Sequence, residues 1–256
     1  MRRDRRQEPE FFVGYLPVPA ALSSFLRGAA IALAALAVVV ALALAAAQRP
    51  LGSGSYEFGV DRALTGALRL EPVPALWMAG EAAAAGEPPA LRVVPLVGEG
   101  KRGLGAALSA LAGREVRLTG RFIRRVGVAL FEVSRGEVTG EGAAPVLAST
   151  PLGRATLAGE IVDSKCWLGV MKPAEGKSHK DCAIRCISGG APAALAARDG
   201  RGGAAVLLLV GEDGRPLGRE LLDVVGEPVE VEGEALRVGN LALFATSRAR
   251  VHRIGS

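Results

Sequence analysis

The segment GREVRLTGRFIRRVGVALFEVS (113–134) decides the fold, because a related segment, GEPVEVEGEALRVGNLALFATS, recurs at residues 226–247. Gly120 matches Gly233, and after a one-residue gap ALFEVS matches ALFATS. In both copies apolar residues alternate with polar ones, which is typical of strands that bury one face. We therefore predict that the chain contains two copies of one β-rich unit.

The likeness extends upstream of both segments. Residues 91–113 resemble residues 205–226, since each has an apolar strand-like run, a glycine turn and a short amphipathic helix. Residues 63–76 correspond in the same way to residues 155–168. A further strand near 190–199 would give the second unit the same order. Five strands and one helix predict a small closed barrel of the OB-fold type, with an α+β sandwich as the alternative.

The whole chain is therefore expected to be mainly β (α+β), with an N-terminal transmembrane helix followed by two tandem small OB-like β-barrel domains. The expected segments are a cytoplasmic lead-in at 1–27, the transmembrane helix at 28–47, a linker at 48–60, the first OB-like domain at 61–140, a linker at 141–154, and the second OB-like domain, with a Cys/His insertion, at 155–256.

Residues 28–47 carry no charged side chain, and twenty apolar residues are long enough to cross a bilayer as a helix. Arginines precede this run, so we expect a single-pass inner-membrane protein with a cytoplasmic N-terminus and a periplasmic bulk. A cleaved signal peptide is the alternative, because Ala45 and Ala47 can form a cleavage site. The long lead-in and the long apolar run favour an uncleaved anchor.

The charge pattern gives no indication of a nucleic-acid partner. The formal net charge is +5 over 256 residues, and much of the excess lies in MRRDRR at the N-terminus. The later arginines are interspersed with acids, without a continuous basic face. The chain also lacks the G-x-S-x-G and H-E-x-x-H motifs, and a non-enzymatic role is favoured while the question stays open.

The segment CWLGVMKPAEGKSHKDCAIRC (166–186) contains all three cysteines of the chain and His179, one of its two histidines. The matching part of the first unit has no cysteine or histidine. The segment is therefore interpreted as an insertion into one copy of a repeated scaffold. Because the other copy folds without it, we expect the insertion to serve function.

The spacing in this segment predicts a metal site. Cys182 and Cys186 are four residues apart, so they share a face if residues 178–188 are helical, and His179 lies near that face. Ser178 and the SGG that starts at residue 188 would cap the helix. Cys166 must reach the helix from across a loop. A Cys3His set suits zinc or copper.

Two other interpretations of the cysteines stay open. Outside the cytoplasm thiols tend to oxidise, so Cys166 can pair with Cys182 or Cys186 in a structural disulfide that leaves one spare thiol. This would suit a non-enzymatic scaffold subunit of a membrane complex. Lysines cluster at 165–180, and their charge favours thiolates, which also allows a thiol oxidoreductase. Asp163 either orients His179 or a lysine, or is a turn acid.

Residues 159–195 resemble a motif of uncharacterised bacterial membrane-anchored proteins, V-D-S-x-C-[YW] followed by H-x-x-C-A-x-x-C-[IA]-x-G-G-x-P. The residues that match this pattern are Asp163, Ser164, Cys166, His179, Cys182, Ala183, Cys186, Gly189, Gly190 and Pro192. The resemblance implies a secreted or membrane-anchored β domain associated with a respiratory or redox complex, and it names no reaction. The expected function is thus a membrane-anchored, extracytoplasmic metal-binding accessory protein for redox or metal handling.

Overall fold

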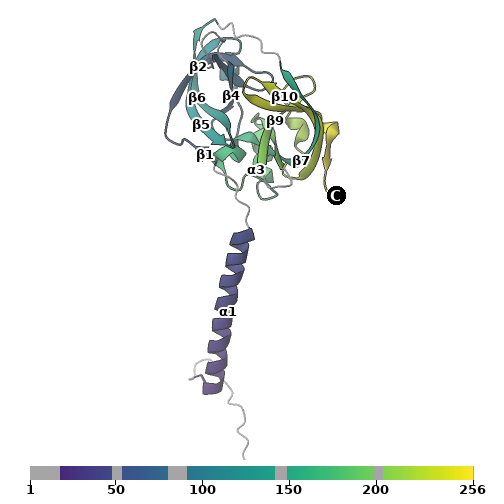
Figure 1. The fold of residues 1–256 in the computed structure, drawn as a ribbon. Coiled ribbons are helices and arrows are strands. Elements are labelled where there is room, and N and C mark those ends of the chain that lie inside the picture. Colours follow the sequence, from purple (N-terminus) through teal and green to yellow (C-terminus); the bar gives the residue numbers. More distant parts are fainter. Residues whose placement is uncertain (1–17, 48–53, 80–90, 142–148, 199–203, 256) are drawn as a thin grey trace, which may run out of the picture. The chain divides into compact units, whose positions relative to one another are not determined.

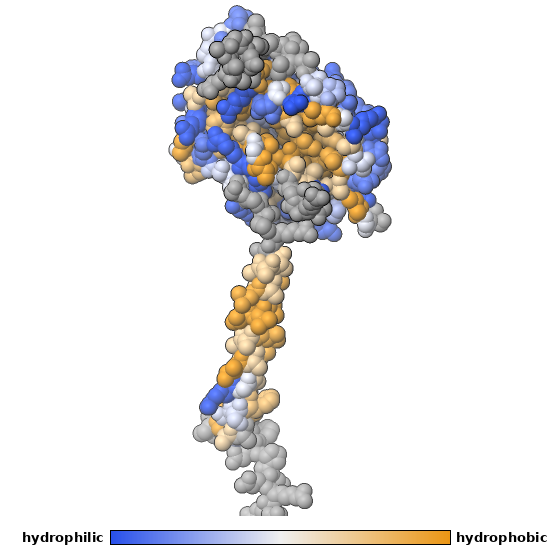
Figure 2. All heavy atoms as spheres, in the orientation of Figure 1, coloured by the Kyte–Doolittle hydropathy of each residue, from blue (hydrophilic) through white to orange (hydrophobic). Residues whose placement is uncertain are grey.

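The computed structural model describes residues 18–47, 54–79, 91–141, 149–198 and 204–255. The chain divides into two units, residues 1–50 and residues 51–256. The first unit contains one helix, α1, which spans Ala20–Ala47. Its first hydrogen bond joins the Ser23 amide to the Pro19 carbonyl at 2.8 Å. Leu22–Ala47 is apolar and long enough to cross a membrane or to act as a signal anchor, and Figure 2 shows its apolar surface.

The first sheet of the second unit closes on itself. Its strand order is β1-β5-β2-β3-β4-β6, and β5 also pairs with β6, so that five strands form a closed barrel and β1 is added at the edge of β5. The elements are β1 (Ser55–Tyr56), β2 (Arg62–Arg69), β3 (Ala75–Ala79), β4 (Leu91–Gly98), α2 (Ala106–Ser109), β5 (Glu115–Arg125) and β6 (Val128–Gly140).

The second sheet has the corresponding order β11-β9-β8-β7-β10-β12 and closes through β11 and β10. Its elements are β7 (Thr150–Asp163), η1 (Cys166–Val170), α3 (Lys180–Ser188), β8 (Ala193–Arg198), β9 (Ala204–Gly211), η2 (Arg219–Leu221), β10 (Pro228–Val238), β11 (Leu241–Thr246), η3 (Arg248–Arg250) and β12 (Val251–Arg253). In each sheet one pair is parallel, β4 with β6 and β9 with β11, and the other pairs are antiparallel. The mainly β prediction is confirmed, whereas the description as two tandem OB-like domains stays a prediction.

The repeated glycines occupy the same kind of place in both sheets. A Cβ at Gly120 would lie 2.0 Å from the Glu132 carbonyl oxygen, and a Cβ at Gly233 would lie 2.3 Å from that of Ala245. The ring of a phenylalanine on the neighbouring strand crosses each glycine, at 2.8 Å and 2.6 Å from the same Cβ positions. Only glycine leaves room for this close approach of two strands. Both barrels therefore have the same packing requirement at this position.

The predicted helices lie in the expected place but are short. Between the third and fourth barrel strands, the first sheet has only the single turn α2 and the second only the 3-10 turn η2. The strand expected near 190–199 is present as β8.

Three boundaries differ from the sequence-based segments. The helix α1 begins at Ala20, before the expected 28–47 span and inside the expected lead-in. Strand β1 lies inside the expected linker 48–60, and β7 begins at Thr150, inside the expected linker 141–154. Small and polar residues suggested linkers there, but β pairing uses backbone groups and does not require apolar side chains. Residues 1–17, 48–53 and 142–148 lie outside the described residues.

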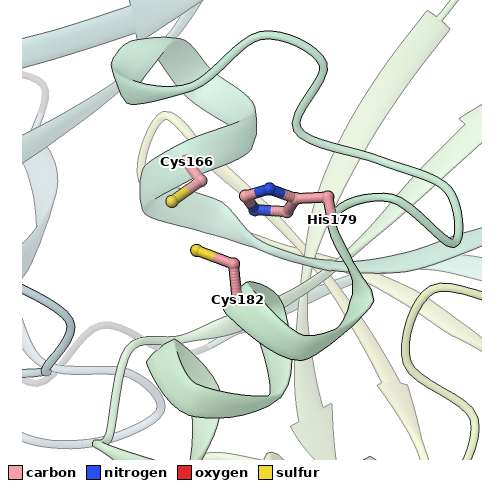
Figure 3. Close-up of side chains that lie close together, drawn as sticks. All are labelled: Cys166, His179 and Cys182. Carbon is pink, nitrogen blue, oxygen red and sulfur yellow. The ribbon is translucent and has the colours of Figure 1, made fainter.

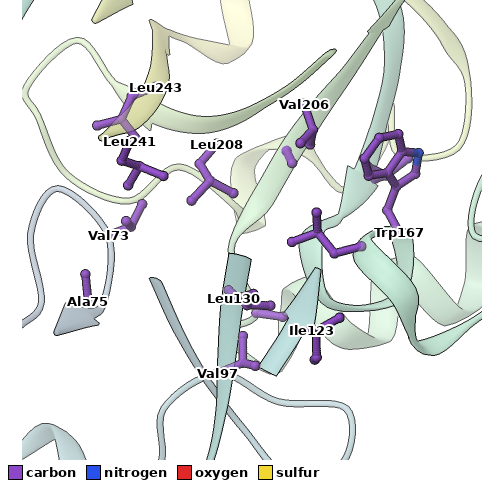
Figure 4. Packing of buried hydrophobic residues seen from close by; sticks show 14 of the residues in the cluster. Val73, Ala75, Val97, Ile123, Leu130, Trp167, Val206, Leu208, Leu241 and Leu243 are labelled. Atoms are coloured by element: carbon purple, nitrogen blue, oxygen red, sulfur yellow. The ribbon is translucent and has the colours of Figure 1, made fainter. Parts of the chain in front are cut away.

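The two closed sheets lie side by side and share one core (Figure 1). The shared apolar cluster includes Ile123 and Leu130 of the first sheet, Leu208 and Leu241 of the second, and Trp167 between β7 and β8 (Figure 4). Each sheet also has an apolar cluster of its own. The two barrels are therefore packed into one compact unit, and the residues that follow β7 lie at their junction.

Candidate functional site

The site is built on a long connection between two neighbouring strands. In the second sheet β7 ends at Asp163 and β8 begins at Ala193, and we call the residues between them, 164–192, the insert. In the first sheet the equivalent strands, β2 and β3, are joined by residues 70–74 alone. The expected insertion into one of two similar sheets is therefore present, and it contains all four predicted metal ligands.

The insert forms two short helical segments that face each other. The segment η1 begins at Cys166, directly after β7, and α3 carries Cys182 and Cys186 one turn apart. His179 is the N-cap residue of α3 and makes no capping hydrogen bond with its side chain, so the expected cap at Ser178 is wrong. The imidazole is consequently free of a capping role. The helix ends at Gly189, as the glycine pair predicted.

Three of the four predicted ligands meet in a compact group. The sulfurs of Cys166 and Cys182 and a ring nitrogen of His179 all lie within 4.8 Å of one another (Figure 3). Cys166 and His179 are each 4% exposed, and Cys182 is half-buried. Residues from η1, from the start of α3 and from its first turn thus present soft donor atoms to one point.

Cys186, the fourth predicted ligand, belongs to a second group that also contains Cys166. Its sulfur forms this second group within 4.8 Å, together with the Cys166 sulfur and a carboxylate oxygen of Asp163. Cys186 is 1% exposed. The four predicted residues therefore form one buried cluster, in which Cys166 belongs to both groups. None of the three cysteines, all of them in the described residues, is in a disulfide.

Asp163 connects the two groups. One carboxylate oxygen accepts a hydrogen bond from the Cys166 amide at 2.8 Å, and the other lies 3.1 Å from His179 Nε2. The side chain is fully buried. A carboxylate in this position fixes the orientation of an imidazole and leaves its second nitrogen for another partner. Of the roles that the sequence left open for Asp163, the structure favours orientation of His179.

The protons of the buried thiols are coupled. The hydrogen bond with Cys186, together with burial and the nearby Asp163, raises the pKa of Cys166. The same hydrogen bond lowers the pKa of Cys186. Cys186 is therefore the first of this pair to become a thiolate, while Cys166 keeps its proton and donates it to the neighbouring sulfur.

Lys165, the clustered lysine next to Cys166, contacts the first barrel through its ammonium group. It is 3% exposed, and its ammonium donates to the carbonyl oxygens of Gly98 at 2.7 Å and Gly100 at 2.6 Å. It also pairs with Glu132 on β6 at 2.5 Å. Glu132 in turn accepts a hydrogen bond from the hydroxyl of Tyr56 on β1. Lys165 therefore ties the insert to the first barrel.

A residue that the sequence did not indicate lies beside the thiols. Lys101, from the loop after β4, makes a hydrogen bond with Cys182 that raises the pKa of Lys101. The glycine-rich segment 98–105 suggested a turn only. No local sequence signal could have linked this lysine to the cysteines, because the contact depends on how the two barrels pack.

The loop after β4 also forms one wall of the site. The Gly103 amide donates to the Gly189 carbonyl at 2.9 Å, at the C-terminal end of α3. A Cβ at Gly103 would lie 2.0 Å from the Gly190 carbonyl oxygen, so the two backbones touch there. On the other side of the insert, the Arg125 guanidinium lies 4.7 Å from the centre of the Trp167 ring. The first barrel thus holds the insert of the second.

A scan against models of protein families, a search of curated proteins and a search of solved structures each found no match for this chain.

Proposed function

We propose that the protein is a membrane-anchored, extracytoplasmic metal-binding protein that takes zinc or copper at Cys166, His179, Cys182 and Cys186. In this proposal it is an accessory protein for redox or metal handling. One observation carries the proposal: the donor atoms of Cys166, His179 and Cys182 lie within 4.8 Å of one another in a buried place.

The donor types and their surroundings fit such a metal. Zn–S and Zn–N bonds are about 2.3 Å and 2.0 Å long, so ligand atoms around one tetrahedral ion lie roughly 3.3–3.8 Å apart. Thiolates and imidazole are also ligands that Cu(I) accepts. Asp163 next to His179 is the outer carboxylate that metal-binding histidines commonly have. Cys186, against Cys166, is the proposed fourth ligand.

The location and partners belong to the same proposal. The apolar helix α1 supplies a membrane anchor, and the arginines before it favour a cytoplasmic N-terminus. The compact unit that follows would then lie in the periplasm as two OB-like barrels. The motif resemblance adds a respiratory or redox complex as the partner, and no nucleic acid is involved.

Elemental analysis of the full chain, purified in detergent, tests the metal site. We expect about one zinc or copper ion per chain, lost in His179→Ala. His252→Ala is the matched control, because His252 is exposed on β12 and is the other histidine of the chain. A chain that contains no metal after incubation with either ion, or a His179→Ala variant that keeps it, would contradict the proposal.

The orientation is tested separately by protease treatment of spheroplasts. The proposal predicts that a protease outside the inner membrane digests the part of the chain after α1 and spares an epitope tag at the N-terminus. Digestion of the tag with protection of the C-terminal part would reverse the orientation. A soluble chain that has lost α1 would support a cleaved signal instead.

A further inference from the structure

We propose that the same insert also exchanges thiols with a disulfide substrate, with Cys182 as the attacking thiol and Cys166 as the resolving thiol. The substrate class is a disulfide carried by a protein or a small molecule. The reaction goes beyond metal binding and stands on the geometry of the sulfurs. The competition between this exchange and metal binding rests on the proposed function.

Exposure distinguishes the three cysteines. Cys182 is half-buried, whereas Cys166 is 4% and Cys186 1% exposed. Of the three cysteines, Cys182 is therefore the one most open to an incoming disulfide. Lys101, from the loop after β4, contacts this sulfur. Cys182 is thus the accessible thiol of the three.

The resolving thiol is chosen by geometry. The sulfurs of Cys182 and Cys166 belong to the same group within 4.8 Å, so a change of side-chain torsion can bring them to bonding distance. Cys186 belongs to the second group, with Cys166 and Asp163, and also contacts Cys182. Cys182 and Cys186 are also one turn apart on α3, where a disulfide between them would distort the helix. Cys166 is consequently the partner of Cys182.

The reaction balances without a further oxidant. The Cys182 thiolate attacks one sulfur of R–S–S–R, the S–S bond breaks, and the first thiolate leaves and takes a proton from solvent. The Cys166 sulfur then attacks the Cys182 sulfur, the bond between Cys182 and the substrate sulfur breaks, and the second thiolate leaves and takes up, through solvent, the proton that Cys166 releases. The net change is protein dithiol plus R–S–S–R to protein disulfide plus two R–SH. The protein is oxidised and the substrate is reduced.

A Cys166–Cys182 disulfide and a bound metal ion cannot use the same two sulfurs at once. A disulfide between Cys166 and Cys182 removes two of the three donors of the compact group. A bound metal ion in turn occupies the attacking sulfur. Metal-loaded protein should therefore exchange slowly, and oxidised protein should bind no metal.

The test uses the full chain in detergent, freed of metal with a chelator and treated with one equivalent of 2,2′-dithiodipyridine. A resolved exchange releases about two equivalents of thiopyridone per reagent, and an unresolved one releases about one. We expect two from the unaltered chain and from Cys186→Ser, and one from Cys166→Ser. Cys182→Ser should react at least about 10-fold more slowly.

Peptide mass spectrometry of the unaltered oxidised chain identifies the bond without any variant. A Cys166–Cys182 disulfide supports the proposal. A Cys182–Cys186 bond, or only mixed disulfides, overturns it, and so does release of two equivalents from Cys166→Ser. The outcome is independent of the metal proposal: a chain that binds no metal but releases two equivalents keeps the exchange activity, and one that binds metal but releases one keeps only the metal site.

Discussion

The connections β2–β3 and β7–β8 occupy the same position in two sheets of the same strand order, yet one is residues 70–74 and the other residues 164–192. The short connection shows that a closed sheet of this kind needs nothing more between these strands. The long one holds the cysteines, His179 and Asp163. The sheet therefore tolerates a long connection at this position, and the other barrel contacts that connection.

The largest effect is expected from removing the ion pair between Lys165 of the insert and Glu132 of the first barrel. Lys165→Met leaves Glu132 buried and without its cation, which should destabilise the protein by about 3–5 kcal/mol. Lys177→Met is the control, with an expected change within about 0.5 kcal/mol. Denaturant unfolding of the unaltered chain and of both variants measures the effect. Equal stability of the two variants would mean that the insert does not depend on the first barrel.

A matched pair of glycine substitutions tests whether the two barrels pack in the same way. Gly120→Ala and Gly233→Ala each place a Cβ at 2.0–2.3 Å from a carbonyl oxygen on the next strand. Each should cost about 1–3 kcal/mol, because the strands must separate to make room. Thermal unfolding of both variants checks this, with Gly105→Ala, where a Cβ meets open space, as the control. A large loss in one barrel alone would show that the shared strand order hides different packing.

The role of Asp163 tests what the insert adds. Asp163→Asn keeps the size of the side chain but removes its charge beside His179, and we expect metal affinity to fall about 10- to 100-fold. Competition with a chromophoric chelator measures this. Asp181→Asn, an exposed acid on α3, is the matched control. Unchanged affinity in Asp163→Asn would limit that carboxylate to holding the Cys166 amide.

The smallest expected effect concerns an ion pair at the C-terminal end of the second barrel. Hydrogen bonds from Arg248 hold the pKa of Asp223 below its ordinary value. Its contribution to stability is therefore complete above the ordinary pKa of about 4 and is lost as pH falls through the lowered value. Because the pair is half-exposed, Asp223→Asn should lower stability by less than about 1 kcal/mol at pH 7. Denaturant unfolding of the unaltered chain and of Asp223→Asn at pH 7 and at pH 3 measures this. The difference between their free energies of unfolding should be smaller at pH 3 than at pH 7, and a larger difference at pH 3 would contradict the prediction.

Much of the fold could be read from local patterns. The alternation in 113–134 and 226–247 predicted β strands that the structure has as β5, β6, β10 and β11. Because the first of the two similar units has no cysteine, the sequence also showed where the insertion lies in the second. The ends of elements were less predictable, because β1 pairs with β5 through backbone groups that leave no mark in the side-chain pattern.

Local sequence patterns were enough to predict the apolar helix, the alternating strands, and the gathering of Cys166, His179, Cys182 and Cys186 in one segment. These follow from hydrophobic periodicity and residue spacing, which act over a few residues. The tertiary structure was needed to show that Lys165 contacts the first barrel, that Lys101 contacts Cys182, and that Cys166 is shared between two groups of donors. The two lysine contacts join segments more than sixty residues apart and exist because the two barrels bury one common core, whereas the donors around Cys166 are brought together by the folding of the insert itself.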